Sequence, residues 1–255
     1  MRPAPPAATA QAGMDAASLA VFARLAREAG GLSIGPGKVD FLAARLAPRL
    51  AALGLADFAA YAGHLASPAG EAERDAFIEC LTTHTTRFFR ERAQYDWLRD
   101  AGFPTLEMAG AGLQRDLVIW SAACSSGQEL YSAMMTAAML GERDGVELRL
   151  RGVGTDLSRA ILAVAERAIY PGAEIADIPD PMRRRFLLTA KDGSERLRIG
   201  PDLRRRARWG RANLAEAGTL PAIRPDVVLL RNVLIYFDAT TCERVLGNVV
   251  ARLAP

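Results

Sequence analysis

Apolar residues in the first hundred positions recur at helical spacing. The stretch "MDAASLAVFARLAREAG" places its larger apolar side chains on one face and ends at a pair of glycines. Four further stretches repeat this spacing, and they begin at Lys38, Leu55, Gly70 and Arg87. The pattern predicts an all-helical N-terminal domain over residues 14–100, with Pro48 kinking or splitting the second helix. Residues 1–13 lack the pattern, which predicts a disordered tail.

The rhythm changes after residues 101–116, whose glycines and weak pattern predict a linker. Apolar strand-like runs then alternate with helical ones: "LVIWSAA" precedes "ELYSAMMTAAMLG", and "LRLRGVGTD" precedes "LSRAILAVAERAIY". Near the end "DVVLLRNVLIYF" precedes "ATTCERVLGNVVARLA". This alternation predicts an α/β domain over residues 117–255, a parallel sheet covered by helices. A Lys-Asp-Gly turn between short β-like runs predicts an antiparallel insertion at about 183–211.

Composition narrows the classes of protein. A net charge of +3 and a pI near 9.0 permit acidic partners without indicating nucleic acid. No apolar run reaches the roughly 18 residues needed to span a bilayer, and the first residues lack the apolar core of a signal peptide. Three scattered cysteines favour a reducing compartment, and two histidines exclude a histidine-rich metal centre. We therefore expect a cytoplasmic monomer without membrane insertion or a metal.

Polar residues follow three of the predicted strands. Ligands of a doubly wound sheet bind beyond the carboxyl ends of its strands. Ser125 to Glu129 follow the first strand, Asp156 closes the second, and Arg231 and Asn232 follow a third that we expect near the middle of the sheet. An acid at the position of Asp156 commonly holds both ribose hydroxyls, although it can also cap the next helix. Together the three ends indicate a nucleoside-containing ligand.

Five strings carry a family resemblance: "TTHTTRFFRE", "WSAACSSGQELYS", "GVGTDLSRAILAVAERAIY", "RARWGRANL" and "VLLRNVLIYF". In this order they resemble the S-adenosylmethionine-dependent chemotaxis receptor methyltransferases of the CheR type, from roughly Phe22 to Pro255. The resemblance implies a Rossmann-like class I methyltransferase domain with a small antiparallel β insertion, preceded by an all-helical domain. It also implies transfer of a methyl group to glutamate side chains of chemoreceptor cytoplasmic helices, which leaves S-adenosylhomocysteine.

The resemblance also implies site residues. Glu129 and Asp156 would bind the methionine amino group and the ribose, while other cofactor-binding residues would flank the adenine or line the pocket. The implied cofactor-binding set is His84, Thr86, Arg90, Glu129, Asp156, Asn213, Leu214, Arg231 and Asn232. Asn213 and Leu214 would flank the adenine, and Arg231 and Asn232 would form the pocket floor.

Two residues are expected to act on the acceptor. Arg90 would hold the acceptor carboxylate through a bidentate pair, and Tyr236 would add a hydrogen bond nearby. We expect His84, Thr86 and Arg90 to reach across an interdomain cleft from the helical domain. A glutamate carboxylate is ionised at pH 7 and needs no general base, which agrees with the scarcity of histidine. Arg90 alone would otherwise be interpreted as a solvated surface residue.

The chain departs from the family pattern at three places. His84 stands where the family commonly has asparagine, and Gln128, Glu129 and Leu130 replace two glutamates and a proline. The sequence stops at "ARLAP", where family members continue into a strand hairpin, so we expect that hairpin to be missing. The alternative function is a non-catalytic S-adenosylmethionine-binding or scaffold protein on the same fold.

Basic residues outside the motifs allow two interpretations. The runs Arg183–Arg185 and Arg204–Arg206 are expected in strands of the insertion, as solvated faces or as a basic surface for an acidic partner. The second helix, with Lys38, Arg45 and Arg49, is a candidate docking face.

Overall fold

The computed structural model describes residues 13–190 and 194–254, and the chain divides into two compact units. Unit 1 runs to Thr82 and includes 236–238, whereas unit 2 comprises 83–235 and the residues from Ala239 onward. The division therefore falls near residue 82 and not after residue 100. The predicted linker contains a helix, α6 (Phe103–Met108), which follows α5 (Arg92–Trp97) and the π-helical turn η3 (Leu98–Gly102). These elements belong to unit 2 because their apolar side chains share its buried core.

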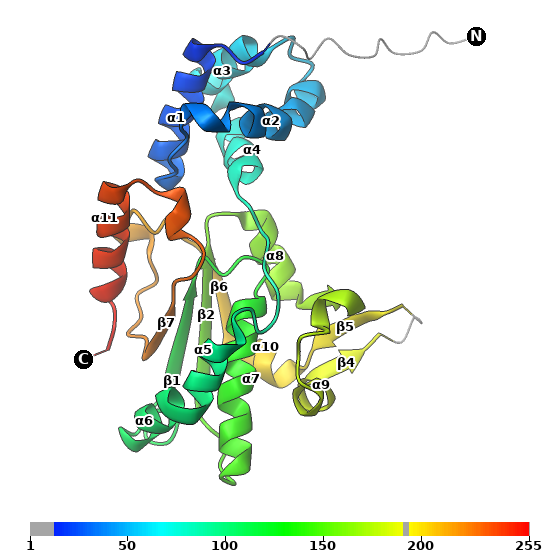
Figure 1. Ribbon diagram of the computed structural model, residues 1–255, viewed down its shortest axis with the longest axis vertical. Helices are drawn as coiled ribbons and strands as arrows, with labels where there is room; N and C mark the ends of the chain where they lie inside the picture. Colours follow the sequence, from blue (N-terminus) through cyan, green and yellow to red (C-terminus); the bar gives the residue numbers. More distant parts are fainter. Residues whose placement is uncertain (1–12, 191–193, 255) are drawn as a thin grey trace. The chain divides into compact units, whose positions relative to one another are not determined.

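Unit 1 contains helices α1 (Ala16–Gly30), α2 (Val39–Leu53), α3 (Phe58–Ala66) and α4 (Glu71–Leu81) within the described residues, with 3₁₀ turns at Pro36–Lys38 and Pro68–Gly70 (Figure 1). Asp15 caps α1 by accepting from the Ser18 N–H at 2.8 Å. Helix α2 runs through Pro48, so the predicted split is wrong. Most of the predicted disordered tail lies outside the described residues.

Two arginines of the proposed docking face are used inside unit 1. Arg49 forms a bidentate pair with the buried carboxylate of Glu73, which also accepts from the Tyr61 hydroxyl at 2.9 Å. Arg45 donates to the carbonyl of Thr82 at 2.8 Å. The face of α2 therefore fixes α4 and the end of the unit, because these guanidinium groups satisfy buried acceptors.

The main sheet of unit 2 is parallel and has the order β6-β2-β1-β7. Its strands are β1 (Leu117–Ala122), β2 (Leu150–Asp156), β6 (Ala207–Arg211) and β7 (Val227–Leu229). From β1 the chain adds β2 and then β6 on one side, and later returns to place β7 on the other side. The order therefore reverses between β1 and β7, which is where doubly wound sheets bind ligands. β7 is an outer strand of the described sheet, so its predicted central place is wrong; alternation alone does not give strand order.

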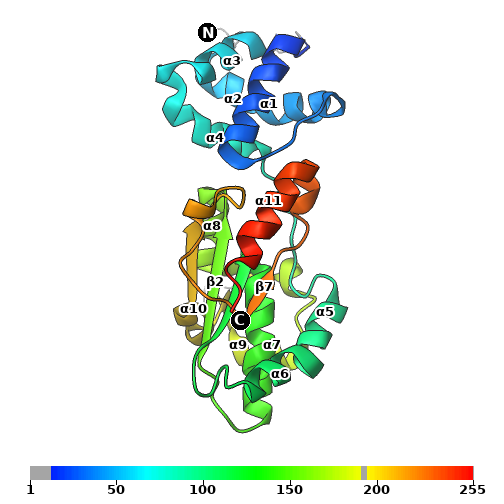
Figure 2. The same ribbon diagram turned by 90° about the vertical axis from the view of Figure 1, so that its left-hand side faces the viewer.

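Unit 2 also contains α7 (Gln128–Arg143), α8 (Arg159–Arg167) and α11 (Ala239–Val250), and η6 (Leu234–Tyr236) precedes α11 in the chain (Figures 1 and 2). α7 packs on β1 and β2, and α8 packs on β2 and β6. Gly152 of β2 lets α7 approach closely, since a Cβ there would lie 2.4 Å from the Met134 sulfur. No helix in the described ranges is long and apolar enough to cross a membrane.

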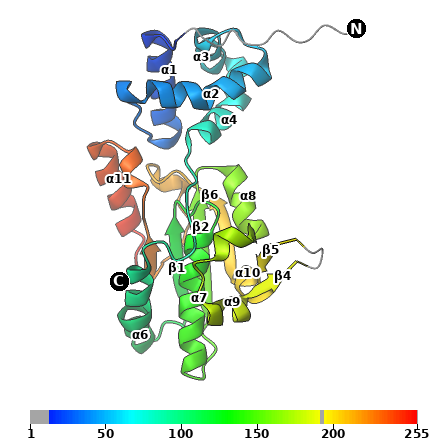
Figure 3. The ribbon, with the colours of Figure 1, turned by 45° about the vertical axis from the view of Figure 1, so that its right-hand side comes forward.

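A second, antiparallel sheet has the order β3-β5-β4, and Figure 3 labels its strands β4 and β5. It consists of β3 (Ile169–Pro171), β4 (Leu187–Thr189) and β5 (Arg196–Ile199), with η4 (Gly172–Ile175), α9 (Asp180–Phe186) and α10 (Pro201–Arg206) beside the strands. The predicted insertion is confirmed, but its bounds of 183–211 are wrong. It begins earlier, at β3, and residues 207–211 form β6 because they pair with β2 in the main sheet. The predicted turn at 191–193 lies outside the described residues.

The arginine runs of the insertion lie in helices and not in strands. Arg183–Arg185 end α9 and Arg204–Arg206 end α10, where positive side chains are favoured by the helix dipole. Arg183 pairs with Asp180, and Arg205 pairs with Asp202. Because these pairs are exposed, each contributes little to stability.

Candidate functional site

The turn after β1 is built from left-handed residues. Ala123, Ser125 and Gly127 have φ angles of 67°, 51° and 92°. At Gly127 a Cβ would lie 2.8 Å from the Trp209 ring, so a side chain is excluded there. The Cys124 N–H donates to the Thr155 carbonyl at 2.8 Å, which fastens the turn to β2. Non-glycine residues in this region are strained and concentrate at functional sites.

Asp156 closes β2 beside this turn and is 9% exposed. Its carboxylate accepts from the Ser125 N–H at 2.8 Å and from the Ser158 N–H at 3.1 Å. Burial raises the pKa of Asp156, while hydrogen bonds and nearby His84 act against the rise. The N-cap of α8 is Ser158, whose hydroxyl accepts from the Ile161 N–H. Asp156 is therefore not needed as the cap, and a carboxylate, with about four lone-pair sites, can accept from a ligand in addition to these backbone groups.

Glu129 lies in the first turn of α7, on the other side of the turn from Asp156. Its carboxylate accepts from the Ser121 hydroxyl at 2.7 Å and lies 3.5 Å from a guanidinium nitrogen of Arg231. Its side chain is 13% exposed, and burial raises the pKa of the carboxyl group. A buried carboxylate with spare acceptor capacity is suited to an ammonium or hydroxyl group of a ligand.

Arg231 follows β7 and is almost fully buried, with 9% of its side chain exposed. It donates to the Tyr95 hydroxyl at 3.0 Å and to the Arg90 carbonyl at 2.5 Å. It also lies 3.2 Å from the Glu91 carboxylate. Its guanidinium group therefore connects Glu129 to the segment of residues 90–95. Asn232 follows with a left-handed φ of 54°.

The segment 83–92 belongs to unit 2, although we expected it to reach across from the helical domain. The reason is the burial of Phe88 and Phe89, which are 0% and 6% exposed in the core of this unit. The Phe89 N–H donates to Ser132 of α7 at 3.0 Å. The His84 carbonyl accepts from the Ser125 hydroxyl at 3.2 Å, so the segment contacts the turn after β1 directly. Arg90 donates to the Thr85 carbonyl at 3.1 Å.

A cavity of about 380 Å³ adjoins the turn and includes His84, Thr86 and Gln128 among its lining residues. Gln128 is 1% exposed; its amide nitrogen donates to Glu174 at 3.0 Å and its amide oxygen accepts from the Ser126 hydroxyl at 2.7 Å. Sequence reasoning missed Glu174. The signal was the neutral Gln128, which suits a neighbour that is itself a carboxylate.

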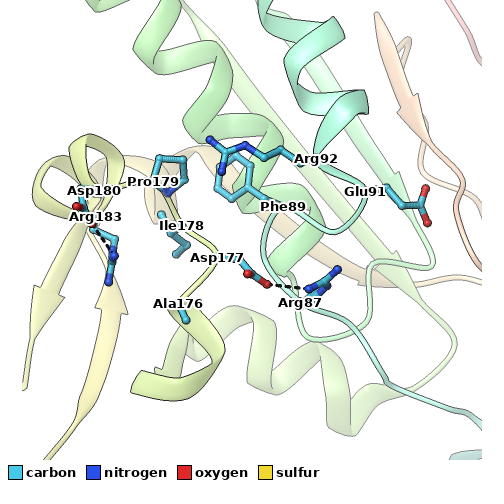
Figure 4. Close-up of a pocket in the computed structure, with 10 residues that line it drawn as sticks. All are labelled: Arg87, Phe89, Glu91, Arg92, Ala176, Asp177, Ile178, Pro179, Asp180 and Arg183. Atoms are coloured by element: carbon cyan, nitrogen blue, oxygen red, sulfur yellow. Dashed lines mark hydrogen bonds and ion pairs between the residues drawn. The ribbon is translucent and has the colours of Figure 1, made fainter.

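A second cavity, of about 450 Å³, lies between the segment 83–92 and the loop before α9. Figure 4 shows the side chains of Arg87 and Asp177 pointing toward each other. Phe89 and Arg92 line the cavity from the same segment of the chain as Arg87. The Arg87–Asp177 pair, at 3.2 Å, is exposed to solvent. Within the described parts of the chain, no hydrogen bond or ion pair of Arg92 is observed.

The remaining predicted residues lie further along the chain. Asn213 is 8% exposed and holds its own loop, donating to Glu216 at 2.8 Å and accepting from the Ala215 N–H at 3.0 Å. Leu214 is buried. Tyr236 groups with unit 1, where its carbonyl accepts from the Ser33 N–H, so its action beside Arg90 stays a prediction. No cluster of metal-ligating side chains occurs in residues 13–190 and 194–254.

These features together define a class of protein. Two buried carboxylates flank a left-handed turn at the switch point of a parallel sheet, and they offer acceptors for hydroxyl and ammonium groups. S-adenosylmethionine carries both, and the residues fit it. The SAM-binding domain of CheR methyltransferases matches residues 84–255, and the all-alpha domain of the same proteins matches residues 17–82. The chain belongs to the CheR methyltransferase family and contains its S-adenosylmethionine-binding domain.

Curated relatives agree with this assignment. Chemotaxis protein methyltransferase 2 of Pseudomonas aeruginosa is 35% identical over 227 residues, which are 88% of this chain and 78% of that protein. The chemotaxis protein methyltransferase of Escherichia coli is 33% identical over 238 residues, 92% of this chain and 79% of that protein. A solved O-methyltransferase family protein from Burkholderia thailandensis aligns over 94% of this chain and 74% of its own, at 16% identity with a TM-score of 0.34, too low to carry an argument.

Proposed function

We propose that this protein transfers the methyl group of S-adenosylmethionine to glutamate side chains of chemoreceptor cytoplasmic helices, forming methyl esters. The observation that carries the proposal is the state of Arg90. Burial raises the pKa of Glu129, and Arg90 lies near enough to act against that rise, yet the one hydrogen bond of its guanidinium group among the described residues is to the Thr85 carbonyl. Most of its five donors therefore remain for an acceptor carboxylate.

In the proposed site this chain's residues position the cofactor. Glu129 accepts hydrogen bonds from the ammonium group and Asp156 accepts from the ribose hydroxyls. The backbone at Asn213 and Leu214 contacts the adenine, since the Asn213 side chain already holds its own loop. When bound, S-adenosylmethionine supplies an electrophilic methyl group on a positively charged sulfur.

The acceptor needs orientation more than activation. Its carboxylate oxygen forms the new bond to the methyl carbon as the carbon–sulfur bond breaks, and the electron pair stays on sulfur. A carboxylate is ionised at neutral pH, so no proton has to be removed. Arg90 holds the acceptor carboxylate through a bidentate pair, which leaves a lone pair of one oxygen free to be aimed at the methyl group. Proximity and orientation then supply most of the rate.

The cavity of Figure 4 supports a protein acceptor. Its lining includes Arg87, Arg92 and Arg183. Arg92 lies two residues after Arg90 in the chain. Because the pairs Arg87–Asp177 and Arg183–Asp180 are exposed, the arginines can exchange these partners for acidic side chains of an acceptor helix at little cost.

The test has two stages. Calorimetry with S-adenosylhomocysteine measures cofactor binding, and transfer from methyl-labelled S-adenosylmethionine to receptor cytoplasmic fragments measures activity. Glutamate esters release labelled methanol at alkaline pH, so the expected result is alkali-labile label that is lost when the accepting glutamates are changed to alanine. Binding without transfer to any such fragment would indicate a non-catalytic cofactor-binding protein and overturn the proposal.

A further inference from the structure

Arg231 bridges two carboxylates, one largely buried and the other exposed to solvent. Glu129 is buried and lies 3.5 Å from one terminal nitrogen of Arg231, whereas Glu91 is 46% exposed and lies 3.2 Å from the other. These three groups alone sum to a net charge of −1; the nearby guanidinium of Arg90, which also acts on both carboxylates, is the group that we assign to the acceptor. A single negative charge beside the turn after β1 is what an ammonium group requires.

We propose that Glu91 is a positioning residue for the cofactor, because it neutralises Arg231 and so leaves the charge of Glu129 available to the cofactor's ammonium group. The inference rests on the proposed role of Glu129 as the ammonium ligand. Glu91 itself does not contact the cofactor; it acts through Arg231. Without Glu91 the buried guanidinium would have Glu129 as its remaining carboxylate partner, and the ammonium group would have to compete with it.

The backbone conformation at Glu91 indicates that contacts with other residues fix its position. Glu91 has a left-handed φ of 58°, and Phe89 and Asn232 have φ angles of 51° and 54°. Such residues persist where the surrounding contacts over-determine them. Arg231 supplies those contacts, since it bonds the Arg90 carbonyl and the Glu91 carboxylate at the same nitrogen.

The ionisation of the two acids separates their roles. Nearby Arg231 holds the pKa of Glu91 below its usual range, so Glu91 stays charged. Burial raises the pKa of Glu129, and the negative charge of Glu91 contributes to the rise. The other polar or titratable groups that face Glu129 are Ser121, Arg90, Arg231, Tyr95 and Cys124.

The test is cofactor affinity of the full chain, measured by calorimetry as a function of pH. Glu91→Gln should bind S-adenosylhomocysteine about five- to thirtyfold more weakly at neutral pH, the effect of removing one nearby charge from a partly screened site. S-adenosylmethionine should lose more, by a further factor of about two, because its sulfonium adds a second positive charge.

The pH profile distinguishes this role from a structural one. In the parent, affinity should fall as acid protonates Glu129, and the fall should begin above the usual carboxyl pKa because that pKa is raised. In Glu91→Gln the like charge is gone, so the fall should move to lower pH although binding at neutral pH is weaker. Loss of packing alone would weaken binding without moving the profile.

Three variants complete the experiment. Glu91→Asp keeps the charge and should stay within about threefold of the parent. Glu142→Gln is the control, since it removes the same charge at the far end of α7, about 20 Å from Glu129. If Glu129→Gln binds like the parent, the ammonium site itself is misassigned. If Glu129→Gln loses affinity while Glu91→Gln keeps it, or loses it with an unmoved profile, the role of Glu91 is refuted.

Discussion

Replacing Gln128 by glutamate should destabilise unit 2, although the chain resembles a family that has glutamate at this position. The Gln128 amide nitrogen donates to the Glu174 carboxylate at 3.0 Å, and the side chain is 1% exposed. Gln128→Glu exchanges this donor for a second carboxylate. The Ser126 hydroxyl can still donate to it, so the change affects the contact with Glu174 alone.

The magnitude follows from this contact. Two carboxylates about 4 Å apart repel by about 4 kcal/mol at an effective dielectric constant of 20. Solvent around the exposed Glu174 reduces that figure, while loss of a hydrogen bond to a charged group adds to it. We expect a loss of about 2–3 kcal/mol in the free energy of unfolding. For a unit of this size that corresponds to a fall of about 5–10 °C in melting temperature.

Urea unfolding of four proteins measures the effect: the parent, Gln128→Glu, Glu174→Gln and the double variant. The double variant should recover most of the loss, because it restores an amide opposite a carboxylate. The repulsion raises the pKa of the new acid in the folded state, so its destabilising effect is present at neutral pH and fades as the pH falls through that raised value. The reasoning would be refuted if Gln128→Glu were as stable as the parent, or if the double variant were no more stable than Gln128→Glu.

Further predictions concern four other residues. Asp156→Ala should weaken S-adenosylhomocysteine binding roughly ten- to a hundredfold by calorimetry, and unchanged affinity in a folded variant would remove the ribose role. Arg90→Ala should lower methyl transfer roughly thirty- to a thousandfold with little change in cofactor affinity, and Arg90→Lys should rescue only in part, whereas equal losses in rate and affinity would make Arg90 a cofactor ligand. His84→Asn should bind and transfer at least as well as the parent, and a large loss would show that histidine has its own role. The hydrogen bond from Arg49 lowers the pKa of Glu73, so this pair stabilises unit 1 at pH values above the carboxyl pKa of the unfolded chain. The stabilisation is lost as the pH falls through the lowered pKa of the folded state. Glu73→Gln should therefore remove this acid dependence from the midpoints of urea unfolding.

Local sequence patterns determined the elements. Apolar spacing predicted the helices of unit 1 and the strands β1 and β2, because period and capping residues act within one turn or strand. The five strings of residues identified the family and with it the cofactor, since the two acids at the ends of these elements occur in a recognisable order. The breaks after β1 predicted a ligand site at the carboxyl edge of the sheet, and the structure brings Glu129 and Asp156 to that edge.

Long-range contacts decided the rest. The sequence assigned 83–100 to the helical domain by its helical spacing, but burial of Phe88 and Phe89 in the core of unit 2 places that segment beside the turn after β1. Glu174, the partner of Gln128, lies 46 positions away along the chain, and the Arg90 carbonyl that accepts from Arg231 lies 141 positions away; no local pattern specifies such pairs. Sequence period fixes which face of an element is apolar, whereas strand order, charge pairing and the surroundings of each carboxylate depend on which elements the folded core brings together.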